Sequence, residues 1–167
     1  MQLHHTGTRR NRTHDRHLSI AEHPKSGEIK MNPREIVEQG MYGRDAFSKW
    51  LGIELLDIQE GYAKVRMTVK PEMTNGFQIA HGGITYSLAD SCFAFASNSH
   101  GRHAVSVETS ISHTKAVFPG DVLVAESQLE NLSGKLGIYT VKVVNQKNEL
   151  VALFKGTVFR KETAWKI

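Results

Sequence analysis

Residues 75–101 read NGFQIAHGGITYSLADSCFAFASNSHG, a glycine pair followed by a run of small and apolar side chains. Small or apolar residues occupy every side of a helical wheel drawn through residues 84–96, which is typical of a helix buried all round. The stretch therefore predicts a central helix from residue 82 to about residue 98. Its one charge is on Asp90, and an unpaired carboxylate inside a protein is costly.

Segments with the alternation of β-strands lie on both sides of this helix. Before it, IELLDIQ and YAKVRMTVK flank Glu60-Gly61, which predicts a hairpin with one solvent-facing side. After it come four strand-like runs separated by short turn sequences: AVSVETSISHTKAV, DVLVAESQLENL, GIYTVKVVN and ELVALFKGTVFR. One broken helix or two short ones are expected between residues 32 and 50. This order predicts an α+β fold, in which an antiparallel meander or a close variant packs against one long helix.

The chain divides into a basic N-terminal segment and a nearly neutral remainder. Residues 1–30 contribute +3 of the net charge of +4, hold five of the nine histidines and lack apolar periodicity. We predict that this segment is a disordered extension or leader, because it has too little apolar surface to offset the entropy of ordering. Folded sequence is expected to begin at MNPREIVEQG, where Asn32 and Pro33 have the pattern of a helix N-cap and first turn. Residues 31–167 are then a single domain.

Composition argues against several classes of protein. The basic segment has no aromatic interleaving and no nucleic-acid-binding motif, so no nucleic-acid partner is expected. No apolar run approaches the length of a membrane span, and no membrane partner is expected. The single cysteine, Cys92, excludes an intramolecular disulfide and indicates a cytoplasmic protein. The histidines do not form a spaced ligand set with Cys92, so no metal is expected.

A chemical site is suggested by the residues around the start of the helix. His81-Gly82-Gly83 presents unpaired N–H groups and the positive end of the helix dipole, to which a carbonyl that becomes an oxyanion can bind. Asn75 lies just upstream and offers an amide donor. Each residue also has a plain structural explanation: Asp90 accepts bonds from nearby hydroxyls, His81 caps the helix, and Asn75-Gly76 forms a turn. Together they make the pattern Asn-x5-His-Gly-Gly-x6-Asp.

This pattern, with LAD around Asp90 and FAFASNSHG after it, resembles the PaaI-type acyl-CoA thioesterases of phenylacetate degradation, in the hotdog-fold superfamily. The resemblance covers about residues 40–160 and includes VNQKNELVALFKG, which is similar to the final hairpin of the family. It implies a sheet wrapped around the central helix. It also implies hydrolysis of an aryl- or acyl-coenzyme A thioester, with phenylacetyl-CoA or hydroxyphenylacetyl-CoA as the best expectation. Coenzyme A is then part of the substrate, and no separate cofactor is implied.

The resemblance also implies roles for individual residues. Asp90 matches the catalytic carboxylate, the backbone N–H of Gly82 matches the oxyanion donor, and Asn75 and His81 match the residues that position the thioester and water.

Three further residues, Gly83, Phe77 and Lys115, are expected to contact the substrate. The chain departs from the family where Lys115-Ala116-Val117 replaces an Arg-Pro-Gly-like element. Lysine keeps the charge but lacks the planar fork of arginine, so the contacts to coenzyme A are expected to differ there.

The spacing of His81 and Asp90 predicts an oligomer. They are nine positions apart, about 13 Å along the axis of a continuous helix, so one thioester carbonyl cannot touch both within one subunit. A symmetric dimer with antiparallel helices supplies Asp90 from the partner subunit. We therefore expect a homodimer at least, and a homotetramer is the further assembly expected.

The sequence leaves alternatives open for the reaction and for the function. Asp90 either forms a mixed anhydride or activates water as a general base. A nucleophilic Cys92 is disfavoured, because it lies about 200° around the helix from Asp90 and has no evident paired base. The alternative functions are a non-catalytic acyl-CoA-binding hotdog module and an enoyl-CoA hydratase. The glycine pair with a single helix carboxylate fits thioester cleavage better than hydration.

Overall fold

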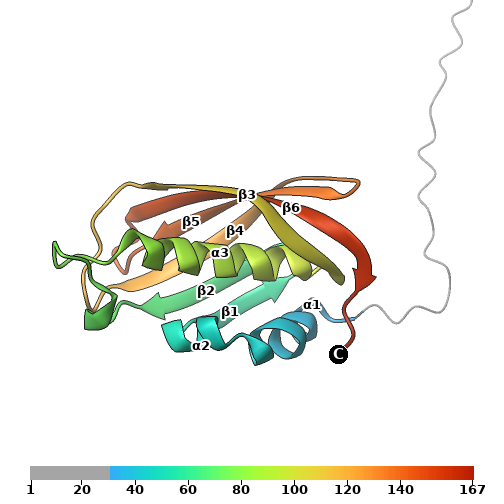
Figure 1. Cartoon of the computed structure of the whole chain (residues 1–167), viewed down its shortest axis with the longest axis horizontal. Helices are drawn as coiled ribbons and strands as arrows, with labels where there is room; N and C mark the ends of the chain where they lie inside the picture. The colour runs from blue at the N-terminus through green and yellow to red at the C-terminus, as the bar shows by residue number, and fades with distance from the viewer. Residues whose placement is uncertain (1–30) are drawn as a thin grey trace, which may run out of the picture.

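The computed structural model describes residues 31–167, so the disorder expected for residues 1–30 concerns a segment outside the described residues (Figure 1). The described chain begins with short helical segments rather than one helix: α1 (Pro33–Glu35), the π-helical η1 (Ile36–Met41), the 3-10 helix η2 (Tyr42–Arg44) and α2 (Ala46–Leu51). Asn32 caps α1 as expected, because its Oδ1 accepts from the Arg34 N–H at 2.9 Å. Asp45 caps α2 in the same way, through the Ser48 N–H.

The rest of the domain is one antiparallel sheet and one long helix. The elements in chain order are β1 (Glu54–Gln59), β2 (Tyr62–Thr68), the short 3-10 helix η3 (Pro71–Met73), α3 (Gly82–Asn98), β3 (Arg102–His113), β4 (Val122–Ser133), β5 (Leu136–Val144) and β6 (Leu150–Ala164). The strands are arranged in the order β1-β2-β4-β5-β6-β3. The α+β class and the central helix are therefore confirmed.

The strand order is a variant of the expected meander. β4, β5 and β6 form consecutive hairpins, but β3 pairs with β6 and lies at the edge of the sheet instead of beside β4. α3 and β3 run antiparallel and are joined by a turn at Gly101. β3 consequently pairs with the long strand β6 along one edge and packs against α3 with one face, and no described strand lies along its other edge.

The core lies between α3 and the sheet that wraps around it (Figure 1). Phe93 of α3 is fully buried, with its ring centroid 5.7 Å from that of Tyr139 and 5.5 Å from that of Phe154. Gly156 of β6 lies directly under this ring, because a Cβ at that position would be 2.6 Å from Phe93 Cζ. The absence of a side chain at Gly156 lets the helix pack closely on the strand.

One side of α3 is left open, which corrects the expectation that this helix is buried all round. Gly83, Ser87, Asp90 and Ala94 fall on one stripe of the helix and all retain exposure to solvent. The expectation was wrong because three of these four residues are small, and a hydropathy pattern treats small residues as compatible with burial. The one charged residue of α3 therefore lies on its open side.

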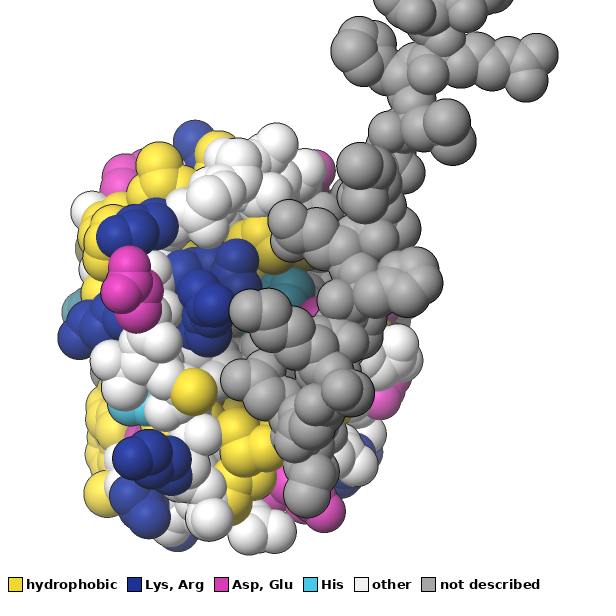
Figure 2. Space-filling model, turned by 90° about the vertical axis from the view of Figure 1, so that its right-hand side faces the viewer, with side chains coloured by type: hydrophobic (Ala, Val, Ile, Leu, Met, Phe, Trp, Pro, Cys, Tyr) yellow, Lys and Arg dark blue, Asp and Glu magenta, His cyan; other side chains and the backbone are white. Residues whose placement is uncertain are grey.

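The surface carries charged and apolar groups side by side. Figure 2 shows the end of the domain where β6 terminates, with Lys and Arg side chains interspersed among apolar and uncharged ones. Within residues 31–167, no helix is both long enough and apolar enough to span a lipid bilayer.

Candidate active site

The first turn of α3 offers one free backbone donor. The Gly83 N–H donates to His81 Nδ1 at 3.0 Å, so His81 is the N-cap of the helix. Because Nδ1 accepts this bond, a neutral His81 carries its proton on Nε2. The Gly82 N–H has no acceptor among the described residues. Of the two glycine amides expected to be available, only that of Gly82 is free.

The loop before α3 is a tight turn that orients Asn75. Its backbone is closed by the Asn75 N–H donating to the carbonyl of Ile79 at 2.8 Å and the Gln78 N–H donating to that of Asn75 at 2.9 Å. Asn75 Oδ1 accepts from the Phe77 N–H at 2.9 Å, which is the turn role that the sequence offered as an alternative. Its amide Nδ2 has no partner among the described residues and remains a donor. Phe77 projects from this turn with 85% of its surface exposed.

A groove of about 350 Å³ opens beside the start of α3. Asn75, Gly82 and Lys115 all line it, so the structure brings together three residues that are separated in the sequence. Thr85 of α3 and His113 of β3 line the same groove.

Lys115 lines the groove and forms an ion pair with Glu149. Its Nζ is 2.5 Å from Glu149 Oε1, and both side chains are exposed. The hydrogen bonds from Lys115 and Asn145 hold the pKa of Glu149 below its usual range. A phosphate that binds Lys115 therefore competes with Glu149 for the ammonium group.

Asp90 lies outside the groove, on the open stripe of α3. No donor among the described residues reaches its carboxylate, and the hydroxyl of the neighbouring Ser91 pairs instead with Ser48 at 2.9 Å. The hydrogen-bonded structural role considered for Asp90 is thus not observed. Partial burial raises its pKa, which makes the carboxylate a stronger base than an ordinary aspartate. Eight helical residues, about 12 Å, separate it from Gly82.

His113, the last residue of β3, is a component of this region that the sequence did not indicate. Its Nε2 lies 3.2 Å from the carbonyl oxygen of Gly82 and 3.1 Å from Thr85 Oγ1. The alternation in SISHT places it on the helix-facing side of a strand, but the contact with Gly82 depends on the antiparallel packing of β3 on α3. No local signal in the sequence predicts that packing.

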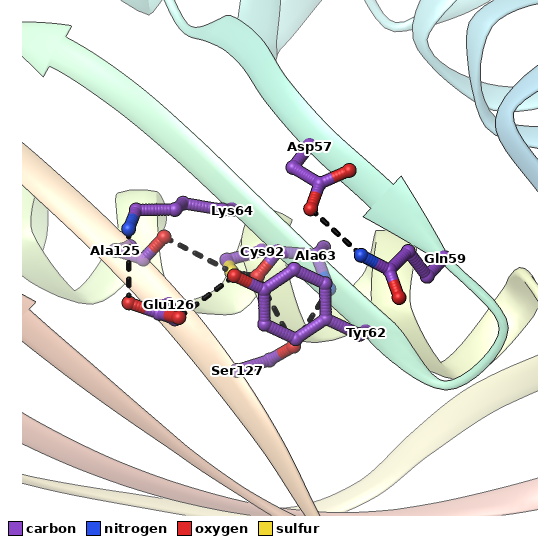
Figure 3. Close-up of polar contacts among 9 residues, drawn as sticks. All are labelled: Asp57, Gln59, Tyr62, Ala63, Lys64, Cys92, Ala125, Glu126 and Ser127. Atoms are coloured by element: carbon purple, nitrogen blue, oxygen red, sulfur yellow. Dashed lines mark hydrogen bonds and ion pairs between the residues drawn. The ribbon is translucent and has the colours of Figure 1, made fainter.

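The Cys92 side chain points from α3 toward Ala63 of β2 and Ala125 of β4 (Figure 3), and Cys92 does not line the groove. Its Sγ is fully buried and donates to the carbonyl of Ala63 at 3.2 Å, and burial raises the pKa of the thiol. A buried thiol with a raised pKa is a poor nucleophile, which agrees with the expectation from the sequence. Within residues 31–167, no three His, Cys, Asp or Glu side chains are grouped closely enough to hold a metal ion.

Comparison with known proteins identifies the family. The family model of the Thioesterase superfamily matches residues 77–152. A putative esterase of Archaeoglobus fulgidus is 48% identical over 75% of this chain and 82% of its own length. The acyl-coenzyme A thioesterase PaaI of Escherichia coli K12 is 43% identical over 72% of this chain and 86% of its own length.

Solved structures agree. The E. coli PaaI protein from the phenylacetic acid degradation operon superposes with a TM-score of 0.78 at 38% identity, covering 82% of this chain and 99% of that one. A Streptococcus mutans protein bound to acetyl CoA superposes with a TM-score of 0.64 at 26% identity, covering 69% of this chain and 91% of that one. The chain therefore belongs to the PaaI-type thioesterases of the hotdog fold and is a thioester hydrolase.

Proposed function

We propose that the protein hydrolyses an acyl-coenzyme A thioester to the free acid and coenzyme A, and that an arylacetyl group such as phenylacetyl or hydroxyphenylacetyl is the preferred acyl group. The observation that carries the proposal is the free N–H of Gly82, which starts a 17-residue helix beside the groove. A donor at a helix N-terminus stabilises the negative charge that develops on a thioester carbonyl. The 43% identity with an acyl-coenzyme A thioesterase supports the same substrate class.

The proposed chemistry uses one backbone donor, one side-chain donor and one carboxylate. The carbonyl oxygen accepts from the Gly82 N–H and from Asn75 Nδ2. An ionised Asp90 removes a proton from water, the water oxygen attacks the carbonyl carbon, and the C–S bond then breaks. The proton passes from Asp90 to the departing thiolate. In a direct attack the ionised carboxylate of Asp90 itself contacts the carbonyl carbon, whereas in the general-base route one water lies between them. Both routes need an ionised Asp90 beside the carbonyl that is bound at Gly82.

The carboxylate that serves Gly82 comes, in this proposal, from a second copy of the chain. β3 is an edge strand of 12 residues, and no described strand pairs with its outer side. Its two valines, Val105 and Val107, are 40% and 58% exposed. A long edge strand presents a row of unpaired N–H and C=O groups that favours pairing with another strand, and antiparallel pairing of two copies continues the sheet.

The position of the two-fold axis follows from the shared site. Asp90 of the partner subunit reaches Gly82 only if the axis passes midway between the levels of these two residues on α3, close to Tyr86. Tyr86 Oη is 2.6 Å from Thr109 Oγ1, so this level on the helix corresponds to Thr109 on β3. The proposal therefore centres the β3 pairing near Thr109.

The remaining predicted residues have supporting positions. Phe77 presents an exposed aromatic ring next to Asn75, and an aryl acyl group can stack on it. Lys115 is placed to meet a phosphate of coenzyme A at the groove. The N–H of Gly83 is bonded to His81 and is not a donor for the substrate. In this proposal, the lack of a side chain at Gly83 lets the substrate approach the helix closely.

A panel of acyl-CoA esters with detection of the released thiol tests the proposal. We expect the highest kcat/KM for arylacetyl esters and a large loss of turnover in Asp90→Asn. Asp57→Asn is the matched control, since Asp57 lies on β1 and accepts from Gln59. Absence of thiol release by the folded protein on the whole panel refutes the proposal. Tight acyl-CoA binding without turnover then indicates a binding module, and loss of the double bond of an enoyl-CoA indicates a hydratase.

A further inference from the structure

We propose that His113 is a positioning residue for the oxyanion donor: by donating from Nε2 to the carbonyl of Gly82, it fixes the first turn of α3 and the direction of the Gly82 N–H. The inference rests on the proposed function, because it assigns a purpose to the same turn. It adds a residue from β3 to a site that the sequence motif places on α3 and on the loop before it.

The contacts of His113 determine its protonation pattern. Nε2 is 3.2 Å from Gly82 O and 3.1 Å from Thr85 Oγ1, and Thr85 Oγ1 donates to Gly82 O at 3.0 Å. A carbonyl oxygen only accepts, so an unprotonated Nε2 would direct a lone pair at another lone pair. The arrangement is satisfied when Nε2 carries the proton and shares it between Gly82 O and Thr85 Oγ1. The neutral ring then has a free lone pair on Nδ1.

The start of α3 needs such a contact because it consists of two glycines. A glycine in a helix is destabilising by roughly 0.5–1 kcal/mol relative to alanine, because of its conformational freedom in the unfolded chain. The N–H groups of the first turn also have no intrahelical acceptor. The bond from a side chain on the sheet to Gly82 O and the His81 cap on Gly83 both hold the peptide unit that joins Gly82 to Gly83. The preceding unit, which carries the Gly82 N–H, is held by the Ile84 N–H, which donates to the carbonyl of His81 at 2.8 Å.

The same contact explains why position 82 has no side chain. A Cβ on Gly82 would lie 3.2 Å from His113 Cε1 and 3.3 Å from Nε2, so the imidazole occupies the space that a side chain would fill. The ring therefore forms the wall of the groove against Gly82 and at the same time restrains that residue. A substitution at either position disturbs the other.

Kinetics of three His113 variants separate hydrogen bonding from packing. Loss of an oxyanion donor costs about 10²–10³-fold in kcat, so a donor that is present but misdirected should cost less, about 10-fold. We expect His113→Ala to lower kcat by about 10-fold with KM changed by less than about 2-fold, because an oxyanion contact acts mainly in the transition state. His113→Gln retains an N–H donor and should recover most of kcat. His113→Phe fills the space without a donor and should not.

His103→Ala is the matched control, because His103 lies at the other end of β3 against the ring of Trp165. We expect this variant to keep the wild-type kcat. Wild-type kcat in His113→Ala, or equal kcat in His113→Gln and His113→Phe, overturns the inference.

A second measurement does not depend on turnover. The ¹⁵N spectrum of histidine-labelled protein, assigned by comparison with His113→Gln, should show His113 protonated at Nε2 at a pH where the ring is neutral. Protonation at Nδ1 overturns the inference even if the enzyme is active. If the wild type hydrolyses no thioester but His113 has the expected tautomer, the proposed function fails and the contact with Gly82 stands.

Discussion

An equimolar mixture of Asp90→Asn and Gly82→Val chains should regain about a quarter of wild-type thioesterase activity, although neither variant is active alone. Gly82 and Asp90 are separated by about 12 Å along α3, whereas a reacting carbonyl must lie within about 3.5 Å of its attacking group. In the proposed symmetric dimer, each site therefore takes Gly82 from one chain and Asp90 from the other. A mixed dimer combines both defects in one site and keeps the second site intact.

The expected recovery follows from random exchange. Equal amounts of the two chains give about half mixed dimers, each with one intact site of two, which is about a quarter of all sites. Valine at position 82 abolishes the site because its Cβ alone meets His113 at 3.2 Å and its methyl groups block approach to the N–H. Exchange is driven by dilution and reconcentration and followed by native mass spectrometry, and activity is measured by thiol release.

The control for this experiment is a mixture of Asp90→Asn with a chain that carries both substitutions. No combination of these two chains creates an intact site, so activity should stay at the background level. If mixed dimers of the two single variants form and also stay at that level, each site lies within one chain and the spacing argument is wrong.

The remaining predictions concern Asp90, the packing at Gly156 and the edge of β3. Asp90→Asn should lower turnover by at least about 10²-fold. The raised pKa of Asp90 means that kcat/KM in the wild type should fall with decreasing pH through a value above that of an ordinary aspartate. A carboxyl group whose pKa is raised in the folded state loses stability for the fold as pH rises through that pKa, because its charged form is disfavoured by burial. Asparagine carries no charge, so Asp90→Asn should have a higher melting temperature than the wild type at neutral pH. Equal melting temperatures would contradict this. Gly156→Ala should lower the free energy of unfolding by about 1–3 kcal/mol in urea titrations, since the new methyl group meets Phe93 Cζ at 2.6 Å; an unchanged midpoint would show that the ring moves freely. Thr109→Cys, which lies opposite its own copy when the pairing is centred at this residue, should form a disulfide-linked dimer on a non-reducing gel, whereas the native Cys92 is buried and unreactive; a monomer band under oxidising conditions would count against pairing at this level.

The central helix was predictable from the sequence because its signals are local. The glycine pair marks the start of α3, and the run of small and apolar residues fixes its length, so the predicted range of 82 to about 98 matches Gly82–Asn98. The open stripe on this helix was not predictable, since alanine, serine and glycine are common in buried and in exposed positions alike. Only the packing of the sheet around α3 decides which side stays open.

Strand pairing was less predictable than strand position. The sequence Phe118-Pro119-Gly120 has turn chemistry, and a tight turn forms there, with the Asp121 N–H donating to the carbonyl of Phe118 at 3.0 Å. This turn does not join neighbouring strands, however, because Gly120 and Asp121 bond to the backbone of Val69 instead. A turn signal reports the local backbone, whereas the choice of partner strand depends on contacts far apart in the chain.

The residues of the candidate site likewise fall into those that a local motif predicts and those that depend on the packing of distant elements. Asn75 and Gly82 form a motif within a few residues, and the structure places both at one groove with Lys115. His113 lies 31 residues from Gly82 and reaches it only because β3 returns along α3. The contact of His113 with Gly82 could therefore be recognised only in the three-dimensional structure.

The position of β6 has a consequence for how the protein is synthesised. β3 has its only described strand neighbour in β6, which is the last described element in chain order and is synthesised well after β3. A nascent chain that ends before Leu150 therefore has β3 without a neighbour on either side, with its valines exposed, and such a product is prone to aggregation. A stop codon placed before Leu150 would remove β6, the strand that pairs with β3 beside His113, and the truncated product would have to be cleared rather than folded.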